Sequence, residues 1–97
     1  MVRELIWTES AYLDLDNIVE YISKDSRYYA LVFYDDVMGK AQSLKKFPHR
    51  GRMVPEDGDP NTREIFIHRY RMIYHVSDDS VSILTIIHGA RIYKETN

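Results

Sequence analysis

Basic side chains are set among β-branched and aromatic residues in the last third of the chain, from Arg63 to Arg91. This composition is typical of strands, so the arginines and histidines are predicted to lie on a sheet rather than on flexible loops. Arginine suits the recognition of anions because its planar fork binds phosphate or carboxylate through two hydrogen bonds and keeps its charge. We therefore predict that this sheet is the working surface and that the segments before it support it.

The charge distribution points the same way. Residues 1–44 contain four basic and eight acidic residues, a balance of −4, whereas residues 45–97 contain nine basic and seven acidic residues, a balance of +2. All four histidines lie in the second part. This asymmetry predicts that the basic part meets an anion, a nucleic acid or an acidic partner. The alternative is a random scatter of surface charge.

Length and composition exclude several classes of protein. Residues 1–97 are enough for one domain with a modest core. The absence of cysteine excludes disulfides and thiolate metal sites. His68 and His75 lie on neighbouring predicted strands, but no third ligand has a convincing spacing, so we expect no metal and no cofactor. No apolar run approaches the roughly 20 residues that span a membrane, and Glu4 stands where a signal peptide needs its apolar stretch. We expect a cytoplasmic protein without membrane contact.

Two helices are predicted after a short strand at residues 2–7. The first has Thr8 or Ser10 as its N-cap, and the second has Asp25 or Ser26. Phe47-Pro48 should stop the second helix, because proline disfavours helix in the residue before it. Both helices carry an apolar stripe at helical spacing, formed by Ala11, Leu15, Ile18, Val19 and Ile22 in the first and by Ala30, Phe33, Tyr34, Val37, Ala41 and Leu44 in the second.

Strands follow a loop-rich segment at residues 48–62, in which a short strand is expected within Arg50–Val54 and a mobile, polar loop at Glu56–Asn61. The three main strands are Arg63–His68, Tyr70–Val76 and Val81–His88. The fold class is therefore α+β: an N-terminal strand and an antiparallel helical hairpin packed on one face of a twisted, mainly antiparallel sheet of four to five strands. The other face, or its rim, is left for function.

At this point the sequence resembles a known family, the RelE/ParE superfamily of small toxins from type II toxin–antitoxin modules, which includes plasmid stabilisation proteins. No single motif is specific, but six occur in the right order and cover nearly the whole chain. They are Trp7 with Ala11, Asp14-Leu15, Ile18 and Tyr21-Ile22; Leu44 with Phe47-Pro48; Gly51-Arg52 with Val54-Pro55-Glu56; Arg63-Glu64; Tyr70-Arg71-Met72-Ile73-Tyr74; and Ile87-His88-Gly89-Ala90-Arg91.

The resemblance implies a toxin that arrests growth and is neutralised by a cognate antitoxin. RelE-like members are ribosome-dependent endoribonucleases that cut messenger RNA, whereas ParE-like members inhibit DNA gyrase and lack a working nuclease site. A non-toxic binding module of the same fold is a third alternative.

The RelE-like alternative assigns catalytic roles to Arg71, Arg91 and His88. The two arginines would stabilise the charged phosphorane, and His88 would act as acid or base because histidine titrates near neutral pH; Tyr93 is a second candidate for proton transfer. If the protein only binds a target or an antitoxin, the candidate contact residues are Arg50, Arg52, Arg71, Arg91 and Tyr93.

Each of these assignments has a purely structural alternative. Arg71 would then be a structural arginine at a sheet edge, paired with Glu64 or an aspartate, and His88 a histidine hydrogen-bonded to backbone. Arg50 and Arg52 would be ordinary surface residues.

The sequence departs from the RelE-like pattern, which has extra lysines ahead of the central strands. Here that segment is acidic, with Glu56, Asp57 and Asp59. The His-Gly-Ala-Arg motif, the Val-Pro-Glu motif and the first-helix pattern resemble ParE more closely. We therefore favour the ParE-like function, with gyrase as target and no enzymatic activity.

Overall fold

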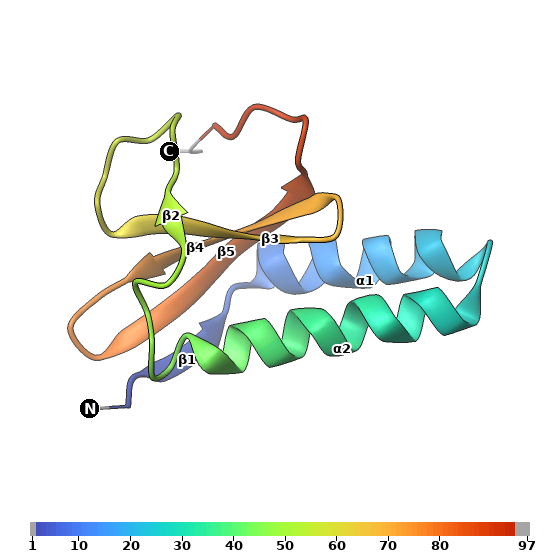
Figure 1. Cartoon of the computed structure of the whole chain (residues 1–97), viewed down its shortest axis with the longest axis horizontal. Coiled ribbons are helices and arrows are strands. Elements are labelled where there is room, and N and C mark those ends of the chain that lie inside the picture. Colours follow the sequence, from blue (N-terminus) through green and yellow to red (C-terminus); the bar gives the residue numbers. More distant parts are fainter. Residues whose placement is uncertain (1, 95–97) are drawn as a thin grey trace.

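Two helices lie side by side against one face of a five-stranded sheet (Figure 1). The structure, a computed structural model, describes residues 2–94. This architecture confirms the α+β class predicted from the sequence. The elements in chain order are β1 (Glu4–Trp7), α1 (Glu9–Ser23), α2 (Arg27–Ser43), β2 (Arg52–Met53), β3 (Thr62–Ile67), β4 (Tyr70–Val76) and β5 (Ser80–His88).

Each helix begins at one of the predicted caps. The Thr8 hydroxyl accepts a hydrogen bond from the backbone N–H of Ala11, and the Ser26 hydroxyl accepts one from Tyr29, both at 3.2 Å. The second helix ends at Ser43, earlier than the predicted stop at Phe47-Pro48, and continues as a turn. Neither helix of the described chain has the length and hydropathy to cross a bilayer.

The strand order in the sheet is β1-β5-β4-β3-β2. Strands β2 to β5 are antiparallel neighbours, while β1 lies parallel to β5 at the edge. A parallel pair requires a long crossover, which the helical hairpin and the strands β2 to β4 provide. The prediction of a mainly antiparallel sheet is therefore confirmed, with β1 as its one parallel member among the described strands.

The core lies between the helices and the sheet. Ile65 and Ile67 of β3 and Met72 and Tyr74 of β4 all face this core, because successive side chains of a strand alternate between the two faces of the sheet. A β-bulge between Ile73 and Tyr74 shifts the pairing with β5 by one residue. This shift brings two further isoleucines, Ile83 and Ile86 of β5, to the helix side.

The second face of the sheet is also partly covered. Glu64, Arg71 and Ile73 lie there and are 1%, 4% and 0% exposed. The loop after β2 and the segment after β5 both run over this side, away from the helices (Figure 1). The sheet face that we expected to be available for function is therefore buried in its middle.

Candidate functional site

Four alternating charges lie across β2, β3 and β4 on the second face of the sheet, and we call them the charge cluster: Arg52, Glu64, Arg71 and Glu56. The strand register brings three of them together. Arg52 stands opposite Glu64, and Glu64 stands opposite Ile73, which places Arg71 on the diagonal, within reach of a long side chain. Arg71 Nε donates to Glu64 Oε1 at 2.6 Å, and Arg52 Nε donates to Glu64 Oε2.

Glu56 completes the cluster from the loop after β2. Its two carboxylate oxygens accept from Arg71 Nη1 and Nη2, each at 2.8 Å, in the parallel geometry that makes such pairs strong. These hydrogen bonds hold the pKa of Glu56 at about 2, well below its ordinary 4.5. The same carboxylate raises the pKa of Arg71 above its already high value. Two cations and two anions thus neutralise one another, and each of the three guanidinium nitrogens of the buried Arg71 donates to an acceptor within the protein.

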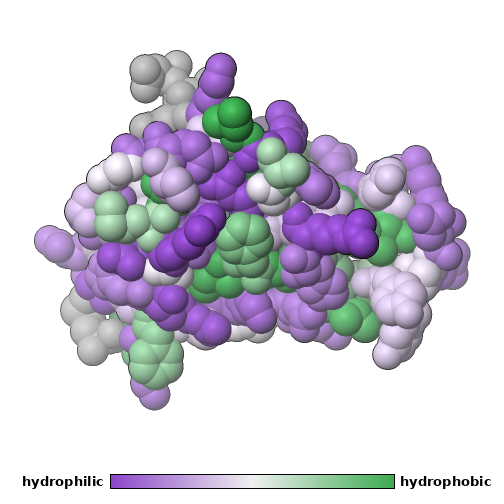
Figure 2. All heavy atoms as spheres, turned by 45° about the horizontal axis from the view of Figure 1, so that its top comes forward, coloured by the Kyte–Doolittle hydropathy of each residue, from purple (hydrophilic) through white to green (hydrophobic). Residues whose placement is uncertain are grey.

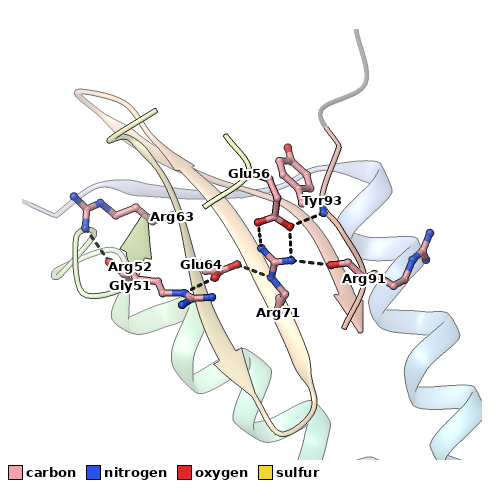
Figure 3. Close-up of polar contacts among 8 residues, drawn as sticks. All are labelled: Gly51, Arg52, Glu56, Arg63, Glu64, Arg71, Arg91 and Tyr93. Atoms are coloured by element: carbon pink, nitrogen blue, oxygen red, sulfur yellow. Dashed lines mark hydrogen bonds and ion pairs between the residues drawn. The ribbon is translucent and has the colours of Figure 1, made fainter. Parts of the chain in front are cut away.

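The segment after β5 joins the same cluster through its backbone. Arg71 Nη1 donates to the carbonyl oxygen of Arg91 at 2.8 Å, and the N–H of Tyr93 donates to Glu56 Oε2 at 2.8 Å. Figure 3 shows that the side chain of Arg91 points away from Arg71 and that only its carbonyl faces the cluster. The two arginines singled out in the sequence therefore lie close together, but their guanidinium groups do not converge.

His88 lies on the other side of the sheet. Its neighbour Ile87 stands opposite Arg71, so the side chain of His88 points to the opposite face. Its ring meets Tyr70 edge to face with centroids 5.7 Å apart, and Tyr70 in turn contacts Phe33 of α2. His88 Nδ1 accepts from the N–H of Ala90 at 3.2 Å. The structure therefore does not bring His88 and the Arg71 guanidinium to one reaction centre.

The family model "ParE toxin of type II toxin-antitoxin system, parDE" matches residues 5–93. This chain belongs to that family. It is 32% identical to "Toxin RelE2" of Caulobacter vibrioides (strain ATCC 19089 / CIP 103742 / CB 15) over 92 residues, which covers 94% of this chain and 100% of the relative. A solved structure titled "Chromosomal ParDE TA system from P. aeruginosa" has the same fold, with a TM-score of 0.72, 23% identity and coverage of 90% of this chain and 96% of that one.

As a ParE-family toxin, the chain presents most of its other candidate contact residues at the surface. Arg52 is exposed along its side chain and stacks over the Phe66 ring at 5.2 Å. Arg50 is exposed beyond the end of α2, where Nη1 donates to the Ser43 hydroxyl at 2.7 Å. Tyr93 is half-buried beside Glu56. Figure 2 turns this side toward the viewer and shows a largely hydrophilic face with a smaller hydrophobic area in its middle.

The structural interpretation of Arg71 predicted a sheet-edge arginine paired with Glu64 or an aspartate. Arg71 is paired with Glu64, but β4 is an internal strand rather than an edge. Sequence reasoning did not assign a site role to Glu56 or Glu64. A signal was available, because both are acids within the family motifs that the sequence contains.

His75 lies on β4, whereas His68, which was predicted to end a strand, lies in the turn between β3 and β4. His68 Nε2 lies 2.6 Å from Asp36, whereas His75 Nε2 lies 3.7 Å from Asp59. Among residues 2–94, no three histidine or acidic side chains are placed to hold a metal ion together.

The free energy of unfolding at low pH should depend on Glu56. Its carboxylate stabilises the fold only when ionised, and its folded-state pKa of about 2 lies below the ordinary 4.5. The contribution is therefore fully present above the ordinary pKa and is lost as the pH falls toward the folded value. We expect about 1–2 kcal/mol, since solvent reaches part of this group.

Urea unfolding of the wild type and Glu56→Gln from about pH 7 to about pH 3 measures this contribution. The difference between the two proteins should be constant at neutral pH and shrink in acid. Asp57→Asn, which removes a charge from the same loop without touching Arg71, is the control. A difference that stays constant down to the lowest pH would contradict the assignment.

Proposed function

We propose that this ParE-family toxin acts by binding DNA gyrase, without cleaving RNA, and that a cognate antitoxin neutralises it. The observation that carries the proposal is that all three guanidinium nitrogens of Arg71 already donate to acceptors within the protein. A ribonuclease needs a cation that is free to stabilise a phosphorane, together with an acid or base beside it. Arg71 instead donates to Glu56, Glu64 and the Arg91 carbonyl, and His88 lies on the opposite face of the sheet.

Exposed arginines beside the charge cluster and at the end of α2 supply groups for protein contact. Arg52, Arg91 and Arg50 carry accessible charge, and guanidinium groups are frequent at protein interfaces. We assign these three residues and Tyr93 to contact with the target or the antitoxin. In this proposal Arg71 does not contact the target. It stabilises the surface that carries the contact residues.

The RelE-like function is the second candidate because the Caulobacter relative bears the name Toxin RelE2. It requires Glu56 to release Arg71 on the ribosome, so that Arg71 and Arg91 can meet the phosphate. Such a release would exchange two carboxylate hydrogen bonds for contacts with RNA.

Two parallel assays on the purified protein distinguish these functions. We expect the wild type to block supercoiling by gyrase and to leave messenger RNA intact in a translating extract. Arg91→Ala should weaken the inhibition by about tenfold if one interface arginine is lost. Arg27→Ala, which removes an exposed arginine at the start of α2, is the matched control and should inhibit normally.

Codon-specific cleavage in the extract would reverse the choice in favour of the RelE-like function. Inhibition of neither process, together with normal growth on strong induction without an antitoxin, would leave the non-toxic binding module.

A further inference from the structure

The segment after β5 leaves the sheet at His88 and yet has a fixed course. Two backbone hydrogen bonds fix its start: the N–H of Gly89 donates to the carbonyl of Arg69, in the turn between β3 and β4, at 2.7 Å, and the N–H of Arg91 donates to the His88 carbonyl at 3.0 Å. Residues 89–94 form no strand or helix. Two hydrogen bonds of its backbone, to Arg71 and to Glu56, tie this segment to the second face of the sheet.

Arg71 can serve as the fixed base of this arrangement because it is buried and held by Glu64. The three edges of its guanidinium point to three different elements: β3 through Glu64, the loop after β2 through Glu56, and the C-terminal segment through the Arg91 carbonyl. A planar group with five donors is suited to such a junction, since fixing one edge fixes the others. Figure 3 shows this convergence.

Glu56 connects Arg71 to the backbone of the C-terminal segment. Its Oε2 accepts from both Arg71 Nη1 and the Tyr93 N–H, so one carboxylate oxygen bridges the buried cation and the C-terminal backbone. A neutral glutamine offers one acceptor oxygen and turns an N–H₂ donor toward the other donor of the guanidinium. Glutamine therefore loses the paired geometry with Arg71 Nη1 and Nη2 that holds the bridging oxygen in place.

The C-terminal segment held in this way walls a cavity of about 510 Å³ against the start of α1 and the second half of β5. Thr8 and Ser10 line one side, and the side chains of Arg91 and Lys94 line the other. Release of the segment would remove this part of the cavity lining, and the Arg91 side chain would no longer be held in one position.

We infer that Glu56 is a positioning residue that, through Arg71, fixes the C-terminal segment in the conformation that presents Arg91 and Tyr93 for binding. The inference rests on the proposed function for the identity of the bound target. The arrangement of Glu56, Arg71 and the C-terminal segment, which we call the clamp, is a property of the free toxin. Binding is tighter when a segment is already ordered, because the ordering cost is met before association. Loss of Glu56 should weaken target binding without removing any group that touches the target.

Amide exchange measured by NMR on the free protein tests the clamp. In Glu56→Gln the Tyr93 amide should exchange about tenfold faster or more, and trypsin should cut after Arg91 faster. The amides of β4 should remain protected, which separates local release from unfolding. Asp57→Asn should behave as wild type. Unchanged Tyr93 exchange and unchanged trypsin cleavage in Glu56→Gln would overturn the clamp.

The supercoiling assay then tests the consequence. Glu56→Gln should require about tenfold more protein for half-inhibition, while Asp57→Asn requires the wild-type amount. Wild-type inhibition by a Glu56→Gln protein with a released segment would overturn the positioning role. A wild type that does not inhibit gyrase would defeat the proposed function alone, since the exchange and trypsin results decide the clamp without any target.

Discussion

Replacing Arg71 with alanine should lower the free energy of unfolding by about 3–5 kcal/mol. The large effect is expected because Arg71 is 4% exposed and pairs with Glu64, which is 1% exposed. Without the guanidinium, the buried Glu64 carboxylate keeps only Arg52, and Glu56 loses its partner. Removing one member of a buried charge network leaves the others desolvated and uncompensated, which costs more than the loss of the contacts alone.

Urea denaturation of Arg71→Ala beside Arg91→Ala checks this expectation. The Arg91 side chain is exposed and only its carbonyl joins the cluster, so Arg91→Ala should stay within about 0.5 kcal/mol of wild type. Arg71→Lys should fall between the two, since lysine keeps the charge and loses the fork. Equal stability of Arg71→Ala and Arg91→Ala would show that the cluster does not stabilise the fold.

The same result affects how loss of function is interpreted. If Arg71→Ala is poorly folded, its loss of toxicity says nothing about catalysis. Glu56→Gln and Arg91→Ala are the informative variants, because each alters the surface at the edge of the cluster and leaves the buried pair of Arg71 and Glu64 in place.

Local features of the fold could be predicted from the sequence because they depend on neighbouring residues. The caps at Thr8 and Ser26 and the alternation of β3 and β4 follow from side-chain chemistry and strand period. The parallel pairing of β1 with β5 could not be predicted in this way. It joins residues more than 70 positions apart, such as Glu4 and Ser80, and depends on the path of everything between them.

The two arginines of the charge cluster were predicted as candidate site residues, whereas its two glutamates were not. The sequence pointed to Arg71 and Arg91, which the structure places in direct contact, though through a carbonyl oxygen. It placed Glu56 in a loop expected to be mobile, whereas the structure shows Glu56 bonded to Arg71. The separation of His88 from Arg71 depends on strand register, because only the pairing of Arg71 with Ile87 shows that His88 faces the helices.

Gly51→Ala should destabilise the protein by about 1–3 kcal/mol, through overpacking rather than through loss of a contact. A Cβ at this position would lie 2.5 Å from the Glu64 carbonyl oxygen and 2.6 Å from the Tyr74 hydroxyl. Neither neighbour can yield easily. The carbonyl belongs to the backbone of β3, and the buried Tyr74 hydroxyl accepts a hydrogen bond from the Gly51 N–H at 3.0 Å.

The damage should extend to the charge cluster. Gly51 directly precedes Arg52, and displacement of β2 would pull the Arg52 guanidinium from Glu64, which sits opposite it. Gly51→Ala should therefore also weaken the residual stabilisation that Arg52 gives to Glu64. In a double-mutant cycle, Gly51→Ala and Arg52→Ala should cost less together than the sum of their separate effects.

Gly39→Ala is the matched control, since it adds the same methyl group where no atom lies within 4 Å, inside α2. It should stabilise the protein by about 0.5–1 kcal/mol, because alanine loses less backbone freedom than glycine when a helix forms. Thermal and urea unfolding of the two variants should thus shift in opposite directions. Equal and small shifts would mean that β2 can move away from β3 at little cost, and the position of Arg52 would then not depend on Gly51.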